Sequence, residues 1–172
     1  MPTPDDPIER ALAALSQASI EFVVVGMFGI NLHARDASET FVTQDLDVLL
    51  RADLSTLKSA LARLSGAGFT FETGGEPFVD LADDQALGNV LRSQATLRGV
   101  FEGEMIIDLM LSMAGMLEEE VASDAIVFQA FGFDVKVGSL EKLLESKRRS
   151  GRPKDLTFLA HYDAVMAEKK KP

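Results

Sequence analysis

The sequence predicts one α+β domain built on a mixed β-sheet, with helices packed mainly on one side and a helical pair at the C-terminal end. Short apolar runs, such as residues 22–25, have the length of buried strands. Longer segments, such as residues 140–147, repeat apolar residues at helical spacing. No internal repeat or long linker divides the 172 residues, so we expect a single domain over 1–172 with a helical extension from about residue 139.

The first half of the chain is expected to alternate helices and strands. Asp5 or Asp6 can cap a first helix, because Pro7 suits the first turn and apolar residues follow at helical spacing. Asp53 can cap a later helix, and glycines follow its expected end. In chain order we expect a helix from Pro7, a strand over 21–25, a helix over 27–34, a strand over 44–50 and a helix over 54–65.

The second half is expected to contain three hairpins and the helical pair. The acids at 80, 83 and 84 are interpreted as a solvated loop, and the methionines at 113 and 116 as core residues of a short helix. Glycine turns and alternating patterns predict the hairpins. They cover residues 69–81, then 89–101 with 105–111, then 126–130 with 133–137. The pattern of 89–101 also allows a helix, but we expect a strand there. The last helices cover 140–150 and 153–167.

Composition excludes several classes of function. The chain has no cysteine and two histidines, which rules out disulfides and thiolate zinc sites and disfavours a His-rich metal site. The net charge is −10 with a pI near 4.6, so the average field opposes nonspecific DNA binding. No segment has the length of a membrane span, and the first residues lack signal-peptide features. A cytoplasmic protein without membrane contact is therefore expected.

An acidic pair gives the first indication of chemistry. Asp45 and Asp47 lie two residues apart at an expected strand, so their side chains point to the same side. Two ionised carboxylates at one point repel each other unless a cation lies between them. Mg²⁺ prefers such oxygen ligands, which makes this pair a candidate metal site.

A third acid lies inside an apolar run. Asp108 is flanked by strand-forming residues on both sides, where an unpaired charge costs free energy. Its partner could be a helix-cap amide or an arginine such as Arg92 or Arg98. Alternatively, Asp108 joins Asp45 and Asp47 in one metal site on neighbouring strands.

Two further segments can contact phosphate. Gly26 ends a buried strand and opens a helix, and such a turn presents free backbone N–H groups. A basic stretch runs from Lys142 to Lys154 in an otherwise acidic chain. That stretch is either the solvated face of a helix or a site for phosphate or a partner.

These motifs together resemble the nucleotidyltransferase superfamily over most of the chain. Within it, the sequence is similar to small bacterial proteins of the minimal-nucleotidyltransferase and AbiEii-like toxin–antitoxin kind. The motifs, as they stand here, are Val25-Gly26-Met27, Thr43-Gln44-Asp45-Leu46-Asp47, Ile107-Asp108-Leu109 and the basic segment from Lys147 to Asp155.

The resemblance implies a Mg²⁺-dependent nucleotidyltransferase fold and activity. Asp45, Asp47 and Asp108 would be the catalytic residues and would bind two Mg²⁺ ions that hold a nucleoside triphosphate, with Asp108 also helping to activate the attacking hydroxyl. The implied nucleotide-binding residues are Gly26, Met27, Thr43, Lys147 and Arg152, with Lys154 beside them. The acceptor would be a hydroxyl of a protein, an RNA or a small molecule, and a toxin–antitoxin partner is a further expectation.

Two positions depart from the family pattern. Met27 stands where the family usually has a second glycine or a serine, and Phe41 stands where it often has an arginine. These departures motivate an alternative, a catalytically impaired protein of the same fold that acts as a partner-binding module. A third interpretation is a structural cation site in an unrelated α+β domain.

Overall fold

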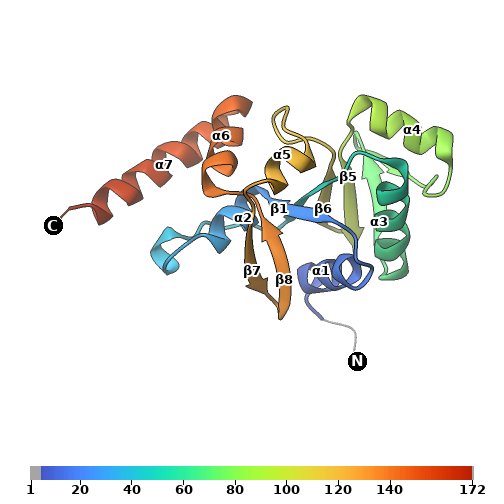
Figure 1. Cartoon of the computed structure of the whole chain (residues 1–172), viewed down its shortest axis with the longest axis horizontal. Helices are drawn as coiled ribbons and strands as arrows, with labels where there is room; N and C mark the ends of the chain where they lie inside the picture. Colours follow the sequence, from blue (N-terminus) through green and yellow to red (C-terminus); the bar gives the residue numbers. More distant parts are fainter. Residues whose placement is uncertain (1–4, 172) are drawn as a thin grey trace.

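A computed structural model describes residues 5–171. Within these residues, eight strands form one mixed sheet in the order β4-β3-β5-β6-β2-β1-β8-β7 (Figure 1). Strand β2 runs parallel to β6, and β1 runs parallel to β8, whereas the other neighbours are antiparallel. The strands are β1 (Phe22–Val25), β2 (Leu46–Leu50), β3 (Thr70–Thr73), β4 (Glu76–Phe78), β5 (Leu97–Phe101), β6 (Glu104–Met110), β7 (Ile126–Ala130) and β8 (Phe133–Val137).

Helices flank this sheet, and several begin at side-chain caps. Asp6, Asp53 and Asp83 each accept hydrogen bonds from backbone N–H groups of the first turn that follows. No described helix is both long and apolar enough to cross a membrane. The helices are α1 (Pro7–Gln17), α2 (Gly26–Leu32), the 3₁₀-helix η1 (Ala37–Glu39), α3 (Leu54–Gly66), α4 (Asp84–Ser93), α5 (Glu118–Ala122), α6 (Leu140–Ser150) and α7 (Pro153–Lys169).

The sequence predicts helices packed mainly on one side of the sheet. The structure differs from this prediction. α1 packs on α3, and α3 on α4, and α3 and α4 lie at the right-hand end of Figure 1. All four residues of β1 are buried, although successive strand residues face opposite sides of a sheet. Both faces of β1 are therefore covered. α5 contacts β1, and its Glu118 lies 3.9 Å from Arg51, which directly follows β2.

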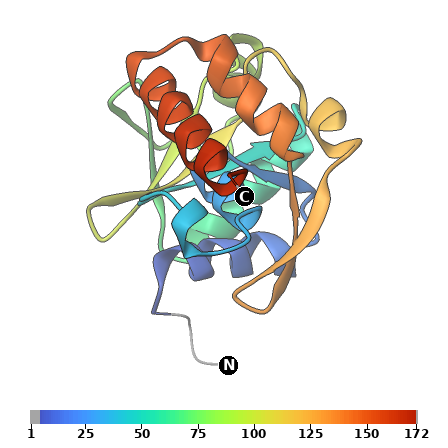
Figure 2. The same ribbon diagram turned by 90° about the vertical axis from the view of Figure 1, so that its left-hand side faces the viewer.

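The C-terminal helical pair is present as predicted. Helices α6 and α7 pack side by side across the front of Figure 2. Asp155, 2% exposed, joins them at their junction. Its carboxylate accepts hydrogen bonds from Lys147 Nζ at 3.0 Å, from Arg152 Nε at 2.7 Å and from the Ser150 hydroxyl.

The far end of α7 is attached to η1. Lys169 Nζ lies 2.6 Å from a carboxylate oxygen of Asp36 and 2.9 Å from one of Glu39. Closer to its middle, α7 packs Phe158 against Phe41 with 4.8 Å between ring centroids. α7 therefore contacts the segment that connects α2 to β2 at two separate places.

Three expected elements differ from those observed. The strand expected over 89–101 begins only at Leu97, because the chain before it forms the end of α4. The acids at 80, 83 and 84 do not form a plain loop, because Asp83 caps α4 and Asp84 begins it. The helix expected around Met113 and Met116 begins later, at Glu118, and the two methionines instead pair through backbone hydrogen bonds in a tight turn.

Candidate metal centre

The sheet register brings the three predicted acids together. Asp47 in β2 lies opposite Asp108 in the parallel strand β6, so both side chains leave the same face of the sheet. Asp45 lies two residues before Asp47 at the entry to β2. Each of the three offers one carboxylate oxygen, and these oxygens all lie within 4.8 Å of one another. The predicted grouping of the three acids is therefore present.

The electrostatics of this cluster favour a bound cation. Desolvation, together with the neighbouring charges of Asp45 and Asp108, raises the pKa of Asp47 to about 7 against the opposing effect of two lysines. Desolvation likewise raises the pKa of Asp108. In the metal-free protein, Asp47 and Asp108 therefore hold a proton more readily than exposed aspartates do, and a cation between the carboxylates would favour their charged forms.

Arg98 is a protein cation at the edge of the cluster. Its Nε lies 3.3 Å from Asp108 Oδ1, and its side chain is half exposed. Arg98 is thus one of the two arginines that the sequence offered as partners for Asp108, while Arg92 binds Asn89 instead. Asp108 belongs both to the acidic cluster and to an ion pair.

A β-bulge creates the contact between Arg98 and Asp108. The turn after β5 pairs Phe101 with Glu104, and that register continued would set Arg98 opposite Ile107. The register shifts by one residue between Gly99 and Val100, which moves Arg98 opposite Asp108. An isolated glycine within a strand is a sequence signal for such a bulge.

The Gly26 turn lies directly against the cluster. Gly26 has φ +65°, and a Cβ built on it would lie 1.9 Å from Asp47 Oδ2. Glycine is therefore required here for both its backbone conformation and its lack of a side chain. Helix α2 that follows has seven residues, and the side chain of Met27 packs against the hydrophobic core.

The other residues expected to bind nucleotide lie in different surroundings. The Thr43 hydroxyl lies 3.1 Å from Asp45 Oδ1, so this residue can orient an acid of the cluster. Lys147 and Arg152 are bound to Asp155 at the helix junction, although the charge of Lys147 still reaches Asp47. These two cations are therefore mainly part of the α6–α7 contact.

Lys154 is the basic residue best placed to act on a ligand. Its charge lowers the pKa of both Asp47 and Asp108, which places it beside the cluster. It is exposed, and it makes no ion pair with any residue from 5 to 171. The sequence alone did not separate it from its basic neighbours.

Phe41 does not face the acids. Its ring contacts Phe158, His161 and Tyr162 of α7, with centroid distances of 4.8, 5.5 and 6.2 Å. Its backbone exchanges hydrogen bonds with the side chain of Asn31. Phe41 therefore holds the segment that leads to Asp45 against α7.

Comparisons with known proteins do not assign this chain to a family. No protein-family model matches the chain, and no curated protein matches it.

Proposed function

We propose that this protein is a Mg²⁺-dependent nucleotidyltransferase that moves a nucleoside monophosphate from a nucleoside triphosphate to a hydroxyl acceptor. The observation that carries the proposal is the approach of three carboxylate oxygens, from Asp45, Asp47 and Asp108, to within 4.8 Å of one another. They come from separate parts of the chain, and a divalent cation between them would offset their mutual repulsion and desolvation.

The donor set suits magnesium. All three ligands are hard carboxylate oxygens on one face of a rigid sheet, and Asp45 is exposed, which leaves access for phosphate and water. Two ions are proposed, since three carboxylates leave coordination positions for substrate oxygens. Bound Mg²⁺ neutralises and polarises phosphate oxygens during phosphoryl transfer.

The chain's own residues would bind and orient the reactants. Asp108, whose pKa is raised, can accept a hydrogen bond or proton from the acceptor hydroxyl. Lys154 can neutralise charge on the departing pyrophosphate. The Gly26 turn keeps the space beside Asp47 free of side-chain atoms.

An Asp47→Asn variant provides the direct test. We expect wild-type protein to bind Mg²⁺ and nucleoside triphosphate in calorimetric titrations and to release pyrophosphate with a suitable acceptor. The variant should lose at least about a hundredfold in turnover, because a charge of the metal site is removed. Asp80→Asn, a matched change in an exposed loop, should behave as wild type.

The proposal is wrong if Asp47→Asn turns over nucleotide like the wild type, or if wild-type protein shows no metal-dependent nucleotide binding. The protein acceptor, RNA acceptor and small-molecule acceptor can be separated by the mass added to each after co-incubation. A toxin–antitoxin partner would be tested by co-expression with a neighbouring gene product.

A second candidate function is a partner-binding module of the same fold without catalysis. The contact between Arg98 and Asp108 favours it, because an internal guanidinium already offsets part of the negative cluster. If the protein is such a module, the Arg98→Gln variant should bind no nucleotide, like the wild type. If the enzyme interpretation is right, the same variant should bind Mg²⁺ at least as tightly as the wild type, since a competing cation has been removed.

A further inference from the structure

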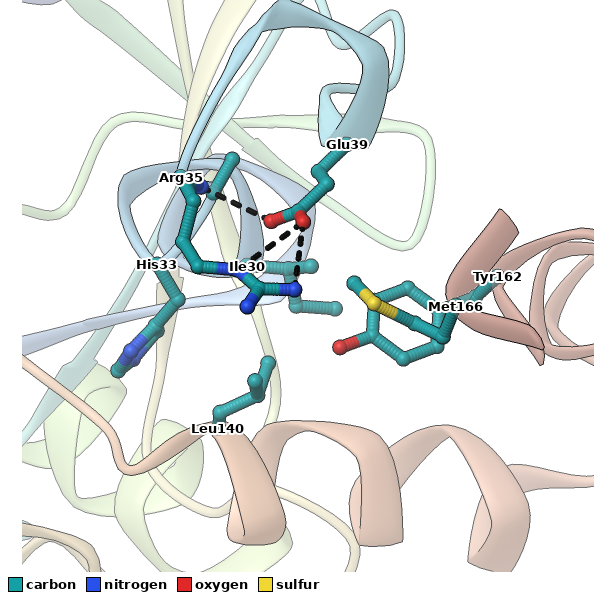
Figure 3. A pocket seen from close by; sticks show the side chains of 8 residues that line it. Ile30, His33, Arg35, Glu39, Leu140, Tyr162 and Met166 are labelled. Carbon is teal, nitrogen blue, oxygen red and sulfur yellow. Dashed lines mark hydrogen bonds and ion pairs between the residues drawn. The ribbon is translucent and has the colours of Figure 1, made fainter. Parts of the chain in front are cut away.

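A pocket lies away from the acidic cluster, beyond the end of α2 and along the later turns of α7. It has a volume of about 250 Å³ and lies between the end of α2, the following turn, α6 and α7 (Figure 3). Lys154 lies in the first turn of α7 beside the acids, whereas Tyr162 and Met166 line the pocket further along the helix. At 1.5 Å per residue, Tyr162 is roughly 12 Å from Lys154 along the helix.

The hydroxyl of Tyr162 is a polar group aimed into this pocket. Tyr162 is 8% exposed, and Figure 3 shows its oxygen pointing toward the space between Arg35 and Leu140. The hydroxyl makes no hydrogen bond with any other described residue, although Phe158 and Phe41 fix the ring by aromatic contacts. Desolvation raises the pKa of Tyr162, so the oxygen keeps its proton and can donate it.

Arg35 supplies a second donor on the same side. Its Nε and Nη2 donate to Glu39 Oε1 at 3.1 and 3.0 Å, and no described contact uses Nη1. In Figure 3 the guanidinium and the Tyr162 hydroxyl both lie in the space between Glu39 and Leu140. The charge of Arg35 also acts on Tyr162, which agrees with this placement.

The remaining polar residues of the pocket are already satisfied. Backbone and side-chain hydrogen bonds from Arg35, with one from Lys169, lower the pKa of Glu39 to about 2 and use both of its oxygens. His33 Nε2 lies 2.8 Å from the Gly138 carbonyl oxygen, and the ring packs on Phe128. Two donors without a described acceptor, the hydroxyl of the buried Tyr162 and Nη1 of Arg35, whose side chain is 73% exposed, therefore lie beside an apolar floor. The floor is formed by Ile30, Ala34, Leu140 and Met166.

We infer that this pocket binds a small carboxylic acid with an apolar body, whose carboxylate accepts hydrogen bonds from Arg35 Nη1 and the Tyr162 hydroxyl. Guanidinium and phenol donors match a carboxylate, and the apolar floor matches an aromatic or branched aliphatic body. The volume lies near the lower end, roughly 300 Å³, of the range found for ligand pockets, which suits a small acid.

Calorimetry or ligand-observed NMR with benzoate and isovalerate tests this site on the full-length protein. Wild-type protein should bind benzoate, and benzamide, which has the same ring but no charge, should bind at least about tenfold more weakly. Failure of both acids to bind, or equal binding of benzamide, overturns the inference without any variant.

Three variants locate the site. Tyr162→Phe removes one oxygen and Arg35→Gln removes the guanidinium, and each should weaken benzoate binding at least about tenfold. Arg63→Gln removes the same charge from an exposed position on α3 and should change nothing. Unaltered binding in both pocket variants would refute the assignment. Asp47→Asn should bind benzoate like the wild type, which separates this site from the proposed nucleotidyl transfer.

Discussion

Asp47 makes the stability of the metal-free protein depend on pH. Its pKa is about 7 in the folded protein against an ordinary 3.8, so the folded state holds a proton that the unfolded chain has released. Stability therefore falls as the pH rises from about 4 to about 7, and it changes little from this group above that range. This loss of stability arises at Asp47, where the proposed chemistry needs a charged carboxylate.

Asp47→Asn should remove this pH dependence. At about pH 8 and without metal, we expect the variant to be more stable than the wild type by on the order of 1–3 kcal/mol, because repulsion and desolvation of a charge are gone. Urea unfolding at about pH 5 and pH 8 measures the effect. Asp80→Asn should retain the wild-type profile. A loss of stability at the higher pH in Asp47→Asn would contradict the assignment.

Gly26 offers a test of the contact between the turn and the acids. Gly26→Ala puts a Cβ into the space held by Asp47 Oδ2 at a left-handed φ, so we expect a loss of about 2 kcal/mol or more and weaker Mg²⁺ binding. Gly66→Ala is the matched control, because its Cβ meets no atom within 4 Å at the end of a helix. That change should be neutral or stabilising by up to about 1 kcal/mol in thermal or urea unfolding. Equal effects of the two substitutions would contradict the proposed close approach.

At the scale of elements, Asp155 fixes the angle between α6 and α7. Burial alone would raise the pKa of Asp155, but hydrogen bonds from Ser150, Lys147 and Arg152 outweigh it and lower the pKa to about 2. The ion pairs therefore contribute stability above the ordinary pKa near 3.8, and this contribution is lost as the pH falls toward 2.

Replacing the Asp155 carboxylate should loosen the helical pair. We expect Asp155→Asn to lower the free energy of unfolding by about 2–4 kcal/mol, because Lys147 and Arg152 lose their buried partner. Circular dichroism during urea unfolding measures the change. Glu168→Gln breaks an exposed ion pair on the same helix and should cost less than about 1 kcal/mol. A similarly small effect at Asp155 would mean that the other contacts of α7, its apolar packing and the ion pairs of Lys169, hold it in place.

The pair of strands β5 and β6 shows where sequence patterns stop being informative. The turn before β6 and the apolar run around Asp108 predicted a strand with this acid inside it, and this is confirmed. The choice of Arg98 over Arg92 depended on a one-residue shift at Gly99, and a pattern of period two does not contain that information. Register, rather than residue type, decided the partner of Asp108.

At the scale of the whole molecule, local signals predicted most elements well. The hairpin over 126–137 and the helix that begins at Leu140 have the predicted bounds, because glycines and a capping serine mark their ends. The distribution of helices over both faces was not predicted, because it depends on which strands become neighbours. The same holds for Lys147 and Arg152, whose charges were visible in the sequence but whose partner Asp155 was not recognised.

The long helix α7 touches both candidate sites. Its first turn carries Lys154 beside the acids, its middle carries Tyr162 in the pocket, and Lys169 at its end binds Asp36 and Glu39. A helix of this length behaves as a stiff rod, so a tilt at one end displaces the other. A ligand that tilted α7 from the pocket would therefore also move Lys154 relative to Asp47 and Asp108.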